Sequence, residues 1–161
     1  MKKNSGGNWV IVLSLLLAIL LTILPLPTWA NWGRPLWVLM VICYWTLALD
    51  EKISVGIAWL IGILLDILGG TIFGEHALVL CLCVFILLKI KKQVRMFPLW
   101  QQAVVILLLG VLYQGVIYLL QGMFGNPPAT IFYWFPIITT AIFWPWIFII
   151  LRDTRRRFKI T

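Results

Sequence analysis

Six long apolar stretches, separated by short segments that hold charged residues, glycine or proline, dominate the pattern of the chain. The stretches do not alternate apolar and polar residues, so they predict helices and not the strands of a membrane barrel. Each approaches the roughly 20 residues that a helix needs to cross a bilayer. The predicted membrane-spanning segments are residues 9–28, 35–49, 53–68, 76–90, 99–120 and 131–151. The sequence therefore predicts an all-α bundle of six transmembrane helices.

The connections between these spans are too short to form a second domain, since none exceeds about ten residues. They hold residues that interrupt helices: Pro25 and Pro27, Asp50-Glu51-Lys52, Gly69-Gly70, the basic run Lys89 to Arg95 ending at Pro98, and Asn126-Pro127-Pro128. Pro136 and Pro145 fall within the last span, where we expect them to bend the helix. Residues 1–161 are thus predicted to form a single polytopic membrane domain.

Composition supports a membrane protein. Of the 161 residues, 63% are hydrophobic and 11% are charged, whereas soluble domains average about 50% and about 25%. So few charged residues cannot coat a water-soluble fold of this size. An ordinary soluble globule is therefore excluded.

The positive charges predict the orientation of the bundle, because Lys and Arg near span ends stay on the cytoplasmic side. With both termini in the cytoplasm, all of the 13 Lys and Arg residues except Arg34 lie on that side. The cytoplasmic set is Lys2, Lys3, Lys52, Lys89, Lys91, Lys92, Arg95, Arg152, Arg155, Arg156, Arg157 and Lys159. We therefore expect an even number of spans.

Tryptophans are expected at the two membrane interfaces. This orientation places Trp29, Trp32, Trp37 and Trp134 near the outer interface and Trp9, Trp45, Trp100 and Trp146 near the inner one. Trp59 and Trp144 fall deeper, where we expect them to pack between helices.

An alternative interpretation of the N-terminus is a secretory signal, with Lys2 and Lys3, an apolar stretch and Thr28-Trp29-Ala30 as a cleavage site. The apolar stretch is longer than usual for a signal, and Trp29 is an awkward cleavage context. A retained first span is therefore favoured.

The densest polar pattern runs through the third and fourth spans. Gly62, Asp66 and Gly70 are four residues apart, so on a continuous helix they would share one face, and Gly74 follows. An ionisable group within a membrane span is a candidate functional residue. In the alternative that we favour, Asp66 lies near the outer end of a short helix and orders the hairpin through hydrogen bonds.

The sequence contains few signs of a catalytic or metal site. Glu75 and His76 could join Asp66 in a metal site, but no ligand spacing supports this, and a role in capping the glycine-rich turn is favoured. No nucleophile and base pattern is present. Cys43, Cys81 and Cys83 match neither a disulfide nor a zinc spacing, so we interpret them as packing residues. We expect a protein that is not an enzyme and has no cofactor or metal.

Two further polar groups stand out. Gln114, Tyr118 and Gln121 form a stripe on the fifth span that either bonds to neighbouring helices or, with Asp66, lines a ligand cavity. The second possibility leaves open an alternative function as a substrate-binding or transport subunit for a small molecule. The C-terminal cations are expected to contact anionic lipid and form a tail too short for nucleic acid: Arg152, Arg155, Arg156, Arg157 and Lys159.

Two motifs resemble the signatures of a known family. Arg34-Pro35-Leu36-Trp37, with Tyr44-Trp45 further on, resembles one signature of the bacterial rod-shape-determining protein MreD family. The stretch from Gly62 to Leu78, with its Gly, Asp, Gly, Gly and His-Ala-Leu pattern, resembles the other; Ile63, where Leu is expected, departs from it. The resemblance extends over essentially the whole chain.

That resemblance implies a non-enzymatic scaffold of the elongasome, the complex that supports lateral peptidoglycan synthesis and rod cell shape. It implies binding to MreC, a bitopic membrane protein, and through it association with RodA, a class B penicillin-binding protein and MreB. It also implies a fold like that of the substrate-binding subunits of energy-coupling factor (vitamin) transporters; a homo-oligomer stays open. The expected partner-binding or structural residues are Arg34, Pro35, Trp37, Tyr44, Trp45, Gly62, Asp66, Gly70, Gly74 and His76.

Overall fold

The computed structural model describes residues 7–50 and 53–160, and every regular element in these ranges is helical. The all-α prediction is therefore confirmed for this part of the chain, whereas Lys2, Lys3 and Lys52 lie outside it. Each predicted span contains one long helix. The elements are α1 (Asn8–Ile23), α2 (Thr28–Asn31), α3 (Trp37–Ala48), α4 (Val55–Gly69), α5 (Glu75–Met96), α6 (Leu99–Met123), η2 (Ile131–Trp134) and α7 (Phe135–Arg157).

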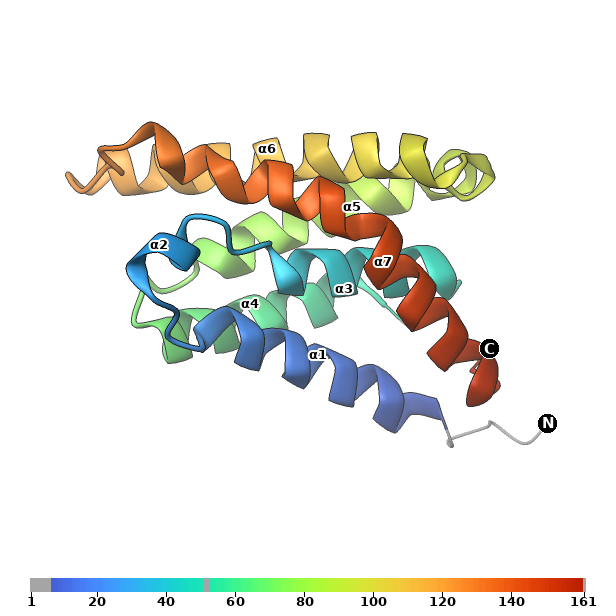
Figure 1. Ribbon diagram of the computed structural model, residues 1–161. Helices are drawn as coiled ribbons and strands as arrows, with labels where there is room; N and C mark the ends of the chain where they lie inside the picture. The colour runs from blue at the N-terminus through green and yellow to red at the C-terminus, as the bar shows by residue number, and fades with distance from the viewer. Residues whose placement is uncertain (1–6, 51–52, 161) are drawn as a thin grey trace.

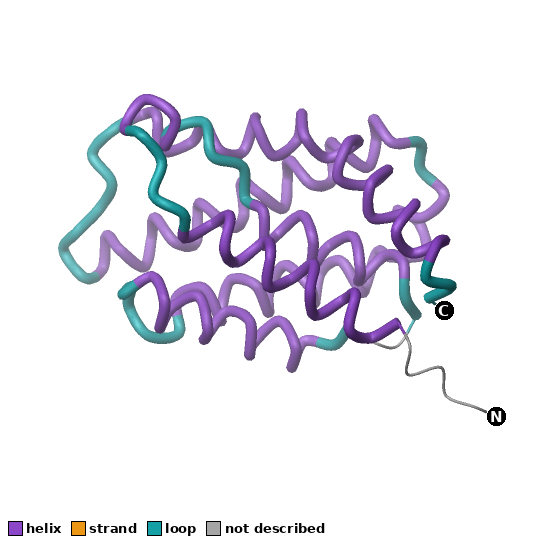
Figure 2. The backbone as a smooth tube through the Cα atoms, turned by 60° about the horizontal axis from the view of Figure 1, so that its bottom comes forward, coloured by secondary structure: helices purple, strands orange, loops and turns teal. Residues whose placement is uncertain are grey.

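The helices pack in three layers. Figure 1 shows α3 and α5 in the middle of the bundle, α6 and α7 along one side, and α1 and α4 along the other. Figure 2 shows the loops gathered at the two ends of the bundle. At one end, α2 lies near the α4–α5 turn; we call this the hairpin end. At the other, α3, α5 and α7 end near the start of α1, with Trp9 stacked edge-on against Phe158 at 5.1 Å.

The described Lys and Arg residues other than Arg34 gather at this second end, which we call the basic end. They lie in the last turns of α5 and α7 and just beyond α7: Lys89, Lys91, Lys92, Arg95, Arg152, Arg155, Arg156, Arg157 and Lys159.

Helix α3 is the core of the bundle. Every residue from Val38 to Leu47 is buried, because α3 packs against α1, α5 and α7. A helix that is apolar on all sides is buried either among other elements or in lipid, and α3 is buried among other helices. At 12 residues, α3 is about 18 Å long. Its polar backbone ends therefore lie within the protein and need partners there.

The N-terminal end of α3 is tied to α7 by a hydroxyl group. Leu36 N–H donates to Thr140 Oγ1 at 2.8 Å, and that hydroxyl donates to Pro136 O at 2.6 Å. Thr140 is fully buried. A single side chain thus joins the start of α3 to the first turn of α7.

The middle of α3 is tied to α1. Trp45 is fully buried, and its Nε1–H donates to Ser14 Oγ at 2.8 Å. The position near the inner interface that the sequence predicts for Trp45 concerns its depth in the membrane and stays a prediction. The indole fills the core because α1 supplies a buried acceptor for its only polar atom.

At the C-terminal end of α3, three cationic side chains from α5 and α7 donate to the last backbone carbonyl groups. Cations at this position satisfy unpaired acceptors and also complement the negative end of the helix dipole. The pairs are Arg95 Nε with Leu47 O, Arg155 with Ala48 O at 2.9 Å, and Lys91 Nζ with Leu49 O and, at 3.4 Å, Asp50 O. One role of the basic end is thus to provide hydrogen-bond donors for the last carbonyl groups of α3.

The carboxylate of Asp50 completes this cluster. Its Oδ1 lies 2.7 Å from the Arg95 guanidinium and 3.7 Å from Lys91 Nζ. The hydrogen bond and the charge of Arg95 lower the pKa of the Asp50 carboxyl. Asp50 therefore stays charged and holds Arg95 beside α3.

The basic run from Lys89 to Arg95 is helical, which corrects its assignment to a connection. Helix α5 continues to Met96 and has 22 residues. Lys91 and Arg95 are four residues apart on it, so both point toward the end of α3. Packing against α3 thus extends the helix beyond the apolar span that the sequence marks.

The two prolines of the last predicted span differ in their effect on α7. Pro136 lies in the first turn of α7, where proline is tolerated, so it does not bend the helix as predicted. Pro145 lies inside α7, and Figure 1 shows the helix changing direction along its length.

Trp144 is fully buried as expected, but Trp59 is 51% exposed, so its predicted packing between helices is wrong. Cys43 and Cys83 are buried and free, in agreement with a packing role.

Two helical segments among the described residues are long and apolar enough to cross a membrane by length and composition. They are Leu99–Met123, whose most apolar 18-residue window has a mean hydropathy of 2.4, and Ile131–Arg157, whose corresponding window has 1.9. The apolar helices α1, α3 and α4 are shorter, and α5 carries the basic run. The count of six spans therefore stays a prediction.

We expect Lys91→Met to destabilise the fold, because it leaves the buried carbonyl of Leu49 without a donor. A lost hydrogen bond to a charged group costs about 1.5–3 kcal/mol. Lys92→Met is the matched control, since Lys92 is exposed. The measurement is the melting temperature of each variant in mild detergent. Equal melting temperatures for the two variants would show that the cations do not hold α3.

Candidate functional site

The candidate site is the hairpin formed by α4, a five-residue turn and α5. Helix α4 ends at Gly69, and Gly70 follows in the left-handed conformation with φ +62°. Gly74, with φ +93°, precedes the first residue of α5. Side chains with a Cβ rarely adopt these angles, so the two glycines define the turn. Gly70 therefore ends the helix, and the expectation that it continues the face of Gly62 and Asp66 is wrong.

The buried carboxylate of Asp66 organises this turn. Asp66 is 2% exposed, and both of its oxygens accept hydrogen bonds from the other side of the hairpin. Oδ1 accepts from Thr71 Oγ1 at 3.0 Å, from His76 N–H at 3.0 Å and from His76 Nδ1 at 2.8 Å. Oδ2 accepts from Gly74 N–H at 2.9 Å. A buried charge is tolerated because it is fully hydrogen-bonded.

Gly62 lets the two helices of the hairpin approach closely. A Cβ at this position would overlap the backbone of Ala77 and lie 2.8 Å from the carbonyl carbon of His76. This contact is one turn of α4 before Asp66. Gly62 and Asp66 therefore hold α4 against α5 at two positions, one helical turn apart.

The network continues to α6 through the first turn of α5. Glu75 is 2% exposed, and its Oε1 accepts from Gln121 Nε2 at 2.8 Å. The ring of His76 lies 6.0 Å from the ring of Tyr113. Asp66, Glu75 and His76 are thus used in packing the hairpin against its neighbours. Among the described residues, no group of three or more His, Cys, Asp or Glu side chains is placed to hold a metal ion.

The Arg34 motif lies at the same end of the bundle and performs a separate task. The Arg34 guanidinium donates to the carbonyl groups of Thr22 and Leu24, at the end of α1. Pro35 is buried, and the ring of Trp37 lies 5.9 Å from that of Phe143 on α7. This motif therefore joins α1, α3 and α7.

The remaining motif residues do not meet at either place. Tyr44 and Trp45 lie in the core of α3, with ring centroids 5.2 Å apart, and Tyr44 also packs against Phe148. The structure thus brings Gly62, Asp66, Gly70, Gly74 and His76 together and distributes the other motif residues over the packing of α3.

The polar stripe of α6 bonds to neighbouring segments of the bundle. Gln114 Nε2 donates to Tyr133 O at 2.9 Å, and Tyr133 Oη–H donates to Gln114 O at 3.1 Å. Tyr118 packs against Tyr133 and Trp134 at 6.1 Å. A cavity of about 150 Å³ near Arg34 and Leu65 is lined by none of Asp66, Gln114 and Tyr118. These residues hold the segment before α7 against α6.

The C-terminal cations separate into two groups. Arg152 and Arg155 are half-buried on α7, and Arg155 is used in capping α3. Arg156, Arg157 and Lys159 are exposed.

Several residues of these networks were not found from the sequence. Thr71 and Thr140 carry short polar side chains that are common in turns and helices, so neither marks a contact with a distant helix. Lys91 and Arg95 were interpreted only as charges that orient the bundle. Their spacing of four residues, on one helix face, was a usable signal for a shared partner.

The bundle and its hairpin define an all-helical membrane protein whose charged and polar motif residues form internal bonds. A family model described as rod shape-determining protein MreD matches residues 3–154 of the chain. The chain is also 30% identical over 157 residues to the "Rod shape-determining protein MreD" of Haemophilus influenzae, covering 95% of each protein. No solved structure matches. The chain belongs to the MreD family, and this membership supports a role in rod shape determination.

We expect Gly62→Ala to lower the melting temperature in mild detergent, because the added methyl group overlaps the Ala77 backbone. Overpacking of this kind costs about 1–3 kcal/mol. Gly115→Ala on α6 is the control, since nothing outside its own helix lies within 4 Å of the added Cβ. Equal stability of the two variants would contradict the close approach of α4 and α5.

We expect Asp66→Ala to destabilise the protein by about 3 kcal/mol or more, because it leaves several buried donors unpaired. Asp153→Ala is the control, since Asp153 is exposed and lies 3.6 Å from Arg152. Thermal unfolding in mild detergent measures both. An Asp66→Ala variant as stable as Asp153→Ala would refute the structural role of the carboxylate.

Proposed function

We propose that the protein is a non-enzymatic, multi-pass scaffold of the bacterial inner membrane that binds the transmembrane helix of an MreC-like bitopic protein. Through that partner it supports lateral peptidoglycan synthesis by RodA and a class B penicillin-binding protein, in association with MreB. Membership of the MreD family is the observation that carries this proposal.

The proposed topology has six spans with both termini in the cytoplasm. It is supported by the gathering of the described Lys and Arg residues at one end of the bundle, with Arg34 at the other. Such an asymmetry is typical of the cytoplasmic face of an inner-membrane protein. In this orientation Arg156, Arg157 and Lys159 contact the anionic leaflet.

A scaffold role is supported by how the polar groups are used. Asp66, Glu75 and Gln114 each bond to another element of the same bundle, and such bonds hold helices in one arrangement. A rigid bundle of this kind presents fixed helix faces to a partner. This use of the polar groups favours a scaffold over a substrate-binding subunit.

The proposed partner-binding face is the outer side of α4, opposite its contact with α5. Gly56, Leu60, Ile63 and Ile67 recur at helical spacing; Leu60 and Ile67 are 61% and 62% exposed. Small and apolar residues on one face are typical of helix association in membranes. Asp66 fixes the position of this face, because it ties α4 to the turn and to α5.

The test is a pull-down of the tagged protein from its native membrane in gentle detergent, with mass spectrometry of proteins and small molecules. We expect recovery of an MreC-like protein, and we expect Ile67→Trp to reduce it by about tenfold by blocking close helix contact. Leu108→Trp on α6, where Leu108 is 61% exposed, is the matched control.

Equal recovery with both variants would contradict the α4 face. Recovery of an ATPase pair or a bound metabolite without cell-wall proteins would contradict the scaffold role and favour a transport subunit.

A further inference from the structure

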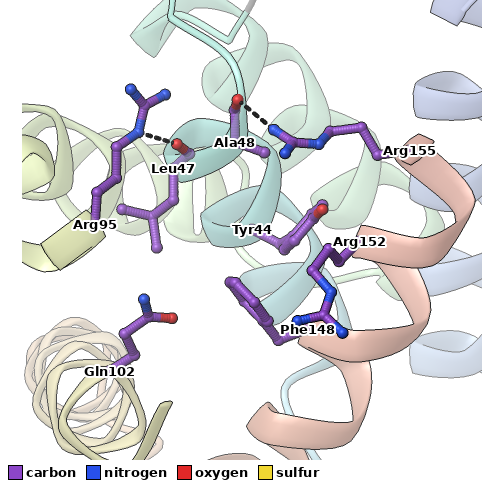
Figure 3. A pocket seen from close by; sticks show the side chains of 8 residues that line it. All are labelled: Tyr44, Leu47, Ala48, Arg95, Gln102, Phe148, Arg152 and Arg155. Carbon is purple, nitrogen blue, oxygen red and sulfur yellow. Dashed lines mark hydrogen bonds between the residues drawn. The ribbon is translucent and has the colours of Figure 1, made fainter. Parts of the chain in front are cut away.

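A pocket of about 270 Å³ opens at the basic end between α3, α5, α6 and α7. Figure 3 shows Arg95 and Gln102 on one side of it and Arg152 and Phe148 on the other. Its polar lining is dominated by guanidinium groups, whereas Leu47, Ala48 and aromatic rings form an apolar wall. The full lining is Tyr44, Leu47, Ala48, Arg95, Gln102, Phe148, Arg152 and Arg155.

The pocket holds an excess of positive charge. No carboxylate belongs to the lining given above, and in the described part of the chain two carboxylates pair with its arginines. Asp50 is paired with Arg95 at 2.7 Å, and Asp153 lies 3.6 Å from Arg152. Both carboxylates are exposed, with side chains 79% and 57% accessible, so water weakens these pairs. Arg155 has no carboxylate partner among the described residues, since its hydrogen bond goes to Ala48 O.

Gln102 adds an unused acceptor beside these donors. Its side-chain NH2 group donates to Val94 O and Phe97 O, both at 3.2 Å, so the orientation of the amide is fixed. Gln102 is 5% exposed, and its Oε1 is buried and accepts no hydrogen bond within the described chain. The buried Nε–H of Arg152 makes no hydrogen bond there either, and the nearby Asp153 Oδ1 lies 3.6 Å from it. Buried polar atoms without partners are rare in folded proteins.

We propose that this pocket binds the head group of one anionic phospholipid, with Arg152 and Arg155 on the phosphate and Gln102 Oε1 accepting from a head-group hydroxyl. Guanidinium groups match the geometry and charge of a phosphate. Arg95 contributes a third positive charge. The ligand chemistry is therefore a phosphodiester next to a hydroxyl, as in a glycerol head group.

The surroundings of the pocket favour a lipid over a free phosphate ion. The wall formed by Phe148 and Leu47 is an apolar face inside the pocket. Acyl chains can lie along this face while the phosphate stays with the arginines. Binding at this pocket is independent of the partner proposed for α4, and it differs from the diffuse attraction of the exposed tail.

The experiment is native mass spectrometry of the detergent-purified full chain titrated with phosphatidylglycerol. Phosphatidylcholine with the same acyl chains, phosphatidylmethanol, which lacks the hydroxyl, and inorganic phosphate are the comparison ligands. We expect one phosphatidylglycerol to bind more tightly than any of these. Arg152→Gln should weaken it on the order of tenfold, as expected for a lost charge-assisted contact, and Arg157→Gln, in the exposed tail, should leave it unchanged.

Arg152 makes no hydrogen bond to the fold among the described residues, so Arg152→Gln should retain the wild-type melting temperature without lipid, which separates lost binding from unfolding. Equal weakening by both variants would show diffuse attraction and overturn the pocket. Displacement of the lipid by millimolar phosphate would assign the site to a soluble anion. Equal affinity for phosphatidylmethanol would overturn the contact with Gln102.

Discussion

The burial of α3 on every side is the constraint on which the rest of the bundle depends. A helix of 12 residues that is surrounded by other helices ends among those helices, where its free backbone groups need partners from the protein. Thr140 supplies the acceptor at its start, and cations of α5 and α7 supply the donors at its end. The same side chains that fix α3 therefore fix the positions of α5 and α7, and charge at the basic end has a structural role besides setting orientation.

At the hairpin end, too, a charged side chain pairs with backbone groups inside the bundle, but here the charge is negative. There the carboxylate of Asp66 binds backbone and side-chain donors of the turn, and Gly62 removes the side chain that would separate α4 from α5. A buried ion that is bonded on all sides favours one arrangement of its neighbours, because any other leaves it unpaired. The residues around Asp66 thus pack α4 against α5 and leave the opposite side of α4 as a fixed outer face.

The sequence predicts the helical class and the approximate position of each long helix, because apolar periodicity and helix breakers are local properties. It also identifies the family through the order of two motifs. It does not predict that Arg95 and Arg155 bond to α3, since these pairs are distant in the chain. Trp45 and Trp59 show the same limit, because both are large and aromatic in the sequence. Trp45 is buried against α1, where it donates to Ser14, whereas Trp59 is exposed on α4. The sequence also does not show that α4 ends before Gly70, because the left-handed conformation of this glycine is a property of the folded turn.

Hydrogen–deuterium exchange of the protein in lipid nanodiscs tests the central claim that α3 is a core helix capped at both ends. Backbone amides bonded in a helix whose ends are capped and buried exchange slowly through the last turn. The account predicts that the amides of residues 45–49 exchange as slowly as those of residues 40–44. Exchange of residues 45–49 as fast as that of Ala129 and Thr130, in the exposed loop before η2, would contradict it, because the end of α3 would then be open to water.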